Sequence, residues 1–179
     1  MFKLLSNAAG FQIVWFTCAL TVQNNPPHNV IWVCIVTLLF LLQHVYFSGK
    51  PKTEIILVLK VSLLGWLLDT LLVQNHLIYF EGSYPGSFSK MQPFWMTCLW
   101  LSLGASLNAS LSWLKPLLSW SSLIGAVVGT LSYLAGAKFG VLRFESTIAI
   151  AITAICWGIA LPILIMLSIE TVDTTPPLA

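Results

Sequence analysis

Residues 54–74 read EIILVLKVSLLGWLLDTLLVQ, an apolar run whose only charged side chains are Glu54, Lys60 and Asp69. A helix that crosses a bilayer needs about 20 predominantly apolar residues, and this segment meets that length. Its second half, LLGWLLDTLLVQ, places a short carboxylate among residues that suit lipid. The segment therefore predicts a membrane-spanning helix and raises the question of what its aspartate does.

The whole chain has the same apolar character. Hydrophobic residues make up 58% of its 179 residues and charged residues only 8%, whereas a soluble domain is about a quarter charged. The mean hydropathy is +0.89. A net charge of +2 without a basic run gives no basis for a nucleic-acid partner. At this length we expect one membrane-embedded domain.

Polar and proline-containing breaks divide the chain into six apolar segments. We expect membrane spans at residues 4–23, 29–48, 54–74, 92–114, 117–137 and 147–168. This pattern predicts an all-α, polytopic integral membrane protein with six transmembrane helices in one compact bundle over residues 1–168. The polar segment 169–179 is predicted to be a disordered tail.

Loop charges indicate the orientation of the bundle. Cytoplasmic loops carry the excess of lysine and arginine in most membrane proteins. With both termini inside, the cytoplasmic side holds Lys3, Lys50, Lys52 and Lys115, and the other side holds Lys90, Lys138 and Arg143. The difference is small, and it favours a cytoplasmic N-terminus and a cytoplasmic C-terminus.

Polar residues inside the spans fall into two layers when depth is counted along each helix at about 1.5 Å per residue. An inner layer contains Asn7, Gln43, His44, Lys60 and Asn108, and an outer layer contains Asp69, Ser132 and Tyr133. Each layer gathers groups from several spans, so each is a candidate for helix bridging or for ligand binding.

Lys60 and Asp69 cannot pair, because nine residues of helix separate them by about 180° and about 13 Å. The long stem of Lys60 allows its ammonium to reach the inner surface. The alternative is a buried ammonium that faces Asn108 and Asn7.

Asp69 needs a hydrogen-bonding partner, since an aspartate at the centre of a membrane helix costs roughly 2.5–3.5 kcal/mol on insertion scales. Tyr133 and the outer basic residues are the candidate partners, and Gly65, one turn earlier, leaves room for a neighbouring helix. Asp69 then locks helices together, or it takes part in binding or proton exchange. An aspartate exposed to water at the interface is the third alternative.

The fifth predicted span carries Gly125, Gly129, Ser132 and Gly136 at three- and four-residue spacing. Small residues on one helix face let backbones approach closely, which is how many membrane helices pack. This face therefore packs inside the same bundle or docks a second copy or another membrane protein. Asn108 shares a face with Gly104 and is predicted to point into the bundle.

The eight tryptophans are explained by anchoring at the membrane interface or by core packing. Trp66 lies deeper and is a candidate for lining a ligand pocket, and Trp95 joins Asp69 and Tyr133 in a possible outer-half pocket. The four cysteines lie singly and are predicted to pack as small apolar residues. No metal or cofactor motif and no catalytic constellation occurs, so the sequence favours a protein that is not an enzyme.

Four stretches carry a resemblance to a known family: GFQIVWF at 10–16, GWLLDTLL at 65–72, PFWMTCLWLSLGASLNASLSWL at 93–114 and GAVVGTLSYLAGAKFG at 125–140. The chain resembles domain-of-unknown-function family 2878, a family of small bacterial membrane proteins. The family pattern includes Trp15, Asp69, Asn108, Ser110, Gly129, Tyr133 and Gly136. The resemblance implies a bacterial inner-membrane location, no defined activity and a link to lipid-modifying enzymes.

These observations lead to three functional hypotheses. The first is an accessory or binding component without catalytic chemistry, in contact with the bilayer, whose ligand is a lipid or a small apolar molecule. The second is the substrate-binding subunit of a vitamin-type transporter, which requires a closed polar pocket near Asp69, Trp95 and Tyr133. The third is a lipid-modifying membrane enzyme, which requires a second titratable group within reach of Asp69 or Lys60.

Overall fold

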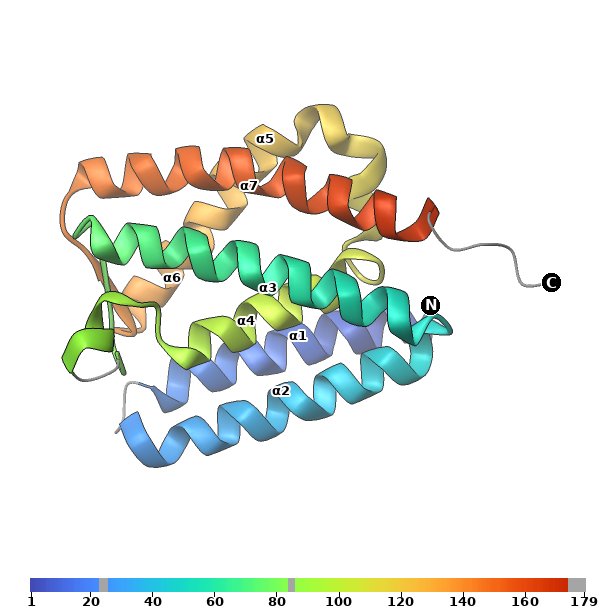
Figure 1. Cartoon of the computed structure of the whole chain (residues 1–179), viewed down its shortest axis with the longest axis horizontal. Coiled ribbons are helices and arrows are strands. Elements are labelled where there is room, and N and C mark those ends of the chain that lie inside the picture. Colours follow the sequence, from blue (N-terminus) through green and yellow to red (C-terminus); the bar gives the residue numbers. More distant parts are fainter. Residues whose placement is uncertain (23–25, 84–85, 174–179) are drawn as a thin grey trace.

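The computed structural model describes residues 1–22, 26–83 and 86–173, and it is a bundle of helices with one short two-stranded sheet (Figure 1). The α-helices are α1 (Phe2–Thr21), α2 (Pro26–Ser48), α3 (Pro51–Gln74), α4 (Phe94–Leu107), α5 (Ser121–Ile124), α6 (Thr130–Lys138) and α7 (Thr147–Asp173). The 3₁₀ helices η1 (Gly86–Lys90) and η2 (Ser112–Trp120), the π-helical turn η3 (Gly125–Gly129) and the strands β1 (Ile78–Phe80) and β2 (Leu142–Phe144) complete the fold.

The bundle has two ends with different content. One end holds the beginning of α1, the end of α2, the beginning of α3, the end of α4 and the end of α7, on the right in Figure 1. We call it the terminal face. The opposite end holds β1, β2 and η1, and we call it the strand face. Both polar layers are described below relative to these two faces.

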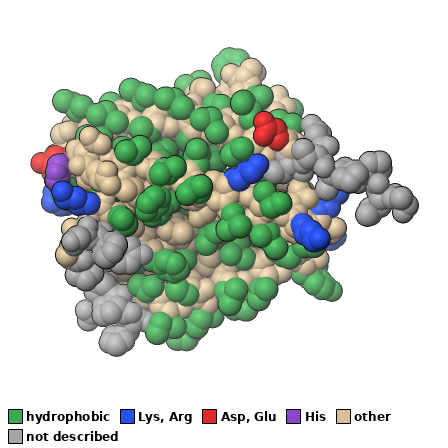
Figure 2. Space-filling view, in the orientation of Figure 1, with side chains coloured by type: hydrophobic (Ala, Val, Ile, Leu, Met, Phe, Trp, Pro, Cys, Tyr) green, Lys and Arg blue, Asp and Glu red, His purple; other side chains and the backbone are tan. Residues whose placement is uncertain are grey.

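The prediction of an all-α membrane protein is confirmed. Within the described residues, five helical segments are long and apolar enough to cross a membrane, and α4 is a shorter apolar helix. Large apolar side chains such as Leu39, Leu63 and Ile155 are exposed on the outside of the bundle. Figure 2 shows hydrophobic side chains over most of one face, with most of its few charged groups toward the two ends. This distribution suits a surface in contact with lipid.

Helix α4 lies at the centre of the bundle, in contact with α1, α2, α3 and α7. Its Ala105, Ser102 and Ser106 are fully buried. Its 14 residues extend about 21 Å at the usual helical rise, less than the ~30 Å thickness of a hydrocarbon core. Non-helical backbone is tolerated at membrane depth where protein surrounds it, so a short central helix is compatible with a bilayer.

The fourth span therefore differs from the predicted 92–114, because the helix ends at Leu107. The cause is a side chain on another helix. Asn7 Oδ1 on α1 accepts the Ser110 amide at 3.2 Å and the Ser110 hydroxyl at 2.6 Å. These bonds take the place of an intrahelical bond. The tight link expected at residues 114–116 is instead part of η2.

The fifth span, predicted at 117–137, is part of one helical segment, Ser112–Lys138, which is kinked at Leu117 and consists of η2, α5, η3 and α6. The π-helical turn η3 packs against α7. A Cβ atom added at Gly125 would lie 2.3 Å from the Trp157 carbonyl oxygen, and one added at Gly129 would lie 2.3 Å from the Trp157 ring. The two glycines thus permit the closest approach between these segments.

The links at the strand face also differ from simple loops. Strand β1 pairs antiparallel with β2 in the register Ile78↔Phe144, Tyr79↔Arg143 and Phe80↔Leu142. The Phe80 ring is buried and packs edge-to-face on the Trp95 ring, with centroids 5.7 Å apart. The pairing joins two links that are far apart in the sequence. No short turn connects the two strands, so the local sequence does not predict their pairing.

The C-terminal helix is longer than the predicted span 147–168. Helix α7 continues to Asp173, so the first residues of the segment predicted as a polar tail are helical. Residues 174–179 of that predicted tail lie outside the described residues.

Candidate functional site

Asp69 on α3 is fully buried and joins two other elements through its carboxyl group. Oδ2 accepts a hydrogen bond of 2.7 Å from the Trp100 indole on α4, and Oδ1 accepts one of 2.5 Å from the Tyr133 hydroxyl on α6. Both partners are themselves buried. The two acceptor atoms of Asp69 therefore each have a donor, which compensates the cost of burying the group.

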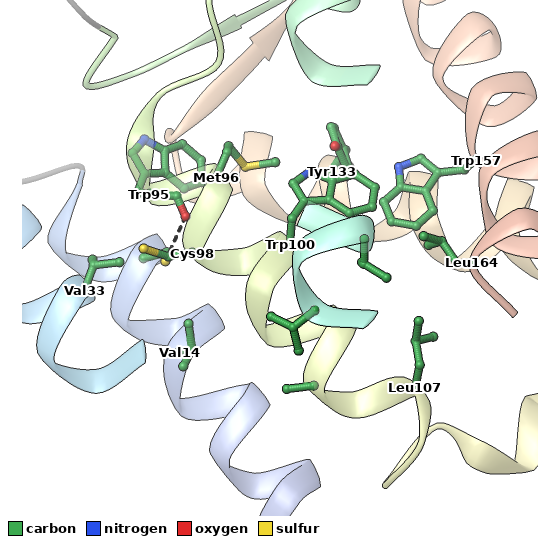
Figure 3. Packing of buried hydrophobic residues seen from close by; sticks show 14 of the residues in the cluster. Val14, Val33, Trp95, Met96, Cys98, Trp100, Leu107, Tyr133, Trp157 and Leu164 are labelled. Atoms are coloured by element: carbon green, nitrogen blue, oxygen red, sulfur yellow. Dashed lines mark hydrogen bonds between the residues drawn. The ribbon is translucent and has the colours of Figure 1, made fainter. Parts of the chain in front are cut away.

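Aromatic rings enclose this carboxyl cluster of Asp69, Trp100, Tyr133 and Trp157. The Trp100 and Trp157 rings are stacked at 5.0 Å and 8°, and Tyr133 meets Trp157 edge-to-face at 6.0 Å. Figure 3 shows the three rings side by side in the core. Gly65 makes this possible, because a Cβ atom there would lie 1.8 Å from the Trp100 ring.

The structure thus brings Asp69 and Tyr133 together, and it adds Trp100, which sequence reasoning missed. Lys90, Lys138 and Arg143 are exposed, so these alternative partners of Asp69 are not the ones seen. Asp69 is 0% exposed, so the alternative of a water-exposed aspartate is wrong as well. The hydrogen bonds of Asp69 connect α3, α4 and α6 in the strand-face half of the bundle, and Trp157 adds α7 to the cluster.

A small cavity lies beside this cluster. It has a volume of about 40 Å³, and its lining includes Trp95, Ser132, Tyr133 and Gly136 but not Asp69. Ligand pockets have volumes of about 300–1,000 Å³, and one water occupies about 30 Å³ of liquid. This cavity is of the size of a water molecule and not of a vitamin.

A second polar cluster lies at the terminal face, and we call it the terminal network. It consists of Asn7 on α1, His44 on α2, Glu54 on α3, Asn108 and Ser110 after α4, and Lys115 on η2. His44 Nε2 lies 3.0 Å from Glu54 Oε2, and the Asn108 amide donates to Glu54 Oε1 at 3.1 Å. Lys115 Nζ donates to Asn108 Oδ1 at 2.6 Å. Glu54 therefore links α3 to α2 and to the segment after α4, and Asn108 extends the network to η2.

The hydrogen bonds of Asn7 fix the orientation of its amide. Oδ1 accepts both bonds from Ser110, so Nδ2 is the donor to the Ala105 carbonyl oxygen at 3.1 Å and to His44 Nδ1 at 3.5 Å. His44 therefore contacts Asn7 through Nδ1, at 3.5 Å, and Glu54 through Nε2, at 3.0 Å. A histidine held this way has a defined orientation next to a carboxylate.

A cavity of about 190 Å³ opens beside the terminal network. Its lining includes His44, Glu54, Asn7 and Asn108. The other lining residues are Lys3, Leu4, Ser6, Gln43, Phe47, Ser48 and Ala109. This volume is larger than that of the cavity near Tyr133, and it lies below the roughly 300–1,000 Å³ of pockets for drug-sized ligands. The terminal face thus has a pocket with both polar and apolar walls, whereas the strand-face half has a closed cluster.

The remaining predicted site residues have simple positions. Lys60 is exposed on α3, so the alternative of a buried ammonium facing Asn108 and Asn7 is wrong. Trp66 is half-buried on α3. Trp95 is buried, and its indole donates to the Glu81 carbonyl oxygen at 2.9 Å, which ties α4 to the link after β1.

The small residues of the fifth span divide between two environments. Gly125, Gly129 and Gly136 are buried inside the bundle. Ser132 is exposed and accepts a 3.3 Å hydrogen bond from the Trp15 indole. The glycine face is therefore covered by α7 and by the segment around β2. Docking of a partner on the fifth span stays a prediction, and of these four small residues Ser132 is the one exposed to such a partner.

Glu54 is the main site residue that sequence reasoning overlooked. It lies 15 residues before Asp69, which places the two acids within about 60° of each other around the helix and about 22 Å apart along it. Extending the Gly65–Asp69 face toward the start of α3 would have found it. Ser110 and Lys115 carry no comparable signal, because they follow the unexpected end of α4.

Neither cluster has the composition of a metal centre. Among residues 1–22, 26–83 and 86–173, no group of three or more histidine, cysteine, aspartate or glutamate side chains lies close enough to hold a metal ion. The terminal network offers one carboxylate and one imidazole, together with amides and a hydroxyl. That set of groups suits a polar organic ligand.

Comparisons with known proteins place the chain in a family but leave its activity open. No curated protein and no solved structure matches it. A family model described as "Protein of unknown function (DUF2878)" matches residues 4–163, which is most of the bundle. The match includes the carboxyl cluster and the terminal network, and the chain therefore belongs to this family of proteins of unknown function.

Proposed function

We propose that this chain is a binding component of a bacterial inner membrane and that its ligand site is the pocket beside the terminal network. The observation that carries the proposal is a cavity of about 190 Å³ with His44, Glu54, Asn7 and Asn108 in its wall. These side chains come from four separate segments, and their hydrogen bonds hold them in defined orientations. A site prepared in this way loses little conformational entropy when a ligand binds.

The location of the pocket suggests the source of the ligand. It lies where α1 begins and α2 ends, at the terminal face, so it faces the depth of lipid headgroups. We place this face in the cytoplasm, which the charges of Lys3, Lys50 and Lys52 support. A link between this protein and membrane lipids is consistent with that placement.

Two other functions have less support. A vitamin-type transport subunit needs a ligand-sized pocket near Tyr133, and the cavity there has a volume of only about 40 Å³. A lipid-modifying enzyme is the second candidate, favoured by the 3.0 Å contact between His44 and Glu54 at the wall of the pocket. A histidine oriented by a carboxylate is a common general base.

Native mass spectrometry of the protein extracted from its membrane tests the proposal. The wild-type chain is expected to retain a bound small molecule. Gln43→Trp should abolish this retention, because the Gln43 side chain lines the pocket and makes no hydrogen bond to the described residues, so a bulky ring there fills the cavity.

The matched control is Gln74→Trp, a substitution at an exposed position at the strand-face end of α3. This variant should keep the ligand. Equal retention by both variants, or a wild-type protein without any bound molecule, would remove the binding proposal. Conversion of added lipids into cleaved products in the same spectra would favour the enzyme instead.

A further inference from the structure

We infer that the pocket at the terminal face recognises a phosphoethanolamine-type zwitterion, in which a primary ammonium and a phosphate are held at opposite ends of the cavity. This inference rests on the proposed binding function and names the chemistry of the ligand. A membrane lipid headgroup and soluble phosphoethanolamine share this chemistry, and the experiment below separates the two.

The wall of the pocket carries opposite charges at two places. Glu54 contributes a carboxylate that is 7% exposed, and Lys3 contributes an exposed ammonium at the rim. Lys3 Nζ lies 3.5 Å from the Phe47 carbonyl oxygen and 5.8 Å from the centre of the Phe47 ring. The helix dipoles add to this separation of charge. Helix α1 begins here with a partial positive charge, and helix α2 ends here with a partial negative charge.

The carboxylate of Glu54 has acceptor positions left for a ligand ammonium. Each of its oxygens receives one hydrogen bond, from His44 and from Asn108, and a carboxylate offers about four acceptor positions. The amide of Gln43 and the hydroxyl of Ser48 lie in the same wall. A primary ammonium has three N–H donors, and the Glu54 carboxylate, the Gln43 amide oxygen and the Ser48 hydroxyl are acceptors for them.

The same wall is unsuited to a quaternary ammonium. Proteins bind trimethylammonium groups in cages of several aromatic rings. Phe47 is the one Phe, Tyr or Trp ring among the residues that line this cavity, and Lys3 already lies over it. The pocket should therefore discriminate between ethanolamine and choline headgroups.

A phosphate is expected at the rim, near Lys3. The Lys3 ammonium is the donor there, whereas the Ser6 hydroxyl in the same wall donates to the Lys3 carbonyl oxygen at 3.1 Å. Leu4 is 49% exposed and lines the pocket beside Phe47, which provides an apolar edge along which acyl chains can leave. The cavity of about 190 Å³ accommodates the headgroup and leaves the chains in the bilayer.

The test titrates the protein in a non-ionic detergent with phosphatidylethanolamine, phosphatidylcholine and phosphatidylglycerol of identical acyl chains. Bound lipid is counted by native mass spectrometry. We expect the ethanolamine lipid to bind at least about 10-fold more tightly than either of the others, a difference of about 1.4 kcal/mol. Soluble phosphoethanolamine should displace it, and ethyl phosphate, which has no ammonium, should not. A lipid that binds more tightly than soluble phosphoethanolamine identifies the membrane as the source.

Two variants separate the two ends of the site. Glu54→Gln should reduce the preference for ethanolamine over glycerol headgroups to within about twofold, because only the ammonium contact is lost. Lys3→Gln should weaken the binding of all three lipids by a similar factor, because all three contain the phosphate. Lys60→Gln is the control, since Lys60 is an exposed lysine on α3 outside the pocket. Lys3 is also exposed, so its substitution leaves the fold intact and keeps the test valid if Glu54→Gln does not fold.

The two levels of the proposal fail differently. If choline or glycerol lipids bind as tightly as ethanolamine lipids, the zwitterion inference is wrong and the binding function stands. If no lipid binds and soluble phosphoethanolamine is also not retained, both are wrong.

Discussion

The buried carboxyl of Asp69 shows at the scale of a single residue how an acid is accommodated in an apolar bundle. Two donors from two other helices reach its two oxygens, at 2.7 Å and 2.5 Å. Each hydrogen bond to a buried carboxylate contributes about 1–3 kcal/mol to stability, because the alternative is an unsatisfied polar group. Asp69 therefore stabilises the junction of α3, α4 and α6 through hydrogen bonds to neutral partners.

Tyr133→Phe tests this role with the loss of one oxygen atom. The ring still packs on Trp157, and Asp69 Oδ1 loses its donor. We expect the free energy of unfolding to fall by about 1–3 kcal/mol, measured by denaturant titration in detergent. Tyr46→Phe removes a hydroxyl from a ring that is 83% exposed and should change little. Equal effects of the two substitutions would mean that the Asp69 contact adds nothing to stability.

At the scale of the element, the π-helical turn η3 shows how the fifth span packs against α7. Its two buried glycines lie against the backbone and the ring of Trp157. The wider turn changes which residues face α7, and this altered face accepts a large indole. The local structure and the tertiary contact therefore depend on each other.

Gly129→Ala should destabilise the protein by about 1–3 kcal/mol, the usual cost of overpacking, because the added methyl group meets the Trp157 ring. The same substitution combined with Trp157→Leu should cost less than the sum of the two single substitutions, since the smaller side chain gives the methyl group space. Unfolding in detergent measures both effects.

Val128→Ala provides the matched control on the exposed side of the same turn. Its effect should add to that of Trp157→Leu within about 0.5 kcal/mol. Additive behaviour of Gly129→Ala as well would argue against the contact with the ring.

The elements differ in how far their sequence predicts them. The spans that form α1, α2, α3 and α7 are predictable because their apolar runs are long and bounded by polar turns. The end of α4 is not, because it depends on Asn7, a residue more than a hundred positions earlier in the chain, which accepts the Ser110 amide. The pairing of β1 with β2 likewise joins links that are distant in sequence.

The two polar clusters follow the same rule. Counting depth along the helices is enough to group Asp69 with Tyr133 and Asn7 with His44, because alternating spans fix the height of each residue. Depth alone does not identify Trp100 as the donor to Asp69, since a tryptophan in an apolar helix is indistinguishable by sequence from one that only packs in the core. The sequence therefore predicts at which depth a polar residue lies, and the packing of the helices determines which residue it bonds to.

At the scale of the whole molecule, the beginning of α1 and the end of α7 both lie at the terminal face, because α4 crosses the bundle despite its short length. Reporter proteins fused to either end in a bacterial host should therefore give the same result, and a cytoplasmic fluorescent reporter should be active at both. A reporter placed in the link after β1 should give the opposite result. Fusions at the two termini that report opposite sides would show that α4 does not cross.

The central position of α4 also has a consequence for biosynthesis. A translocon releases an apolar helix into lipid according to its length and hydropathy, and a segment of 14 residues is short for independent release. Helix α7 emerges later from the ribosome, yet it supplies Trp157, on which Trp100 of α4 stacks. Nascent chains that stall before α7 is made thus present α4 with one side uncovered. Such intermediates are the expected substrates of membrane chaperones and quality-control proteases.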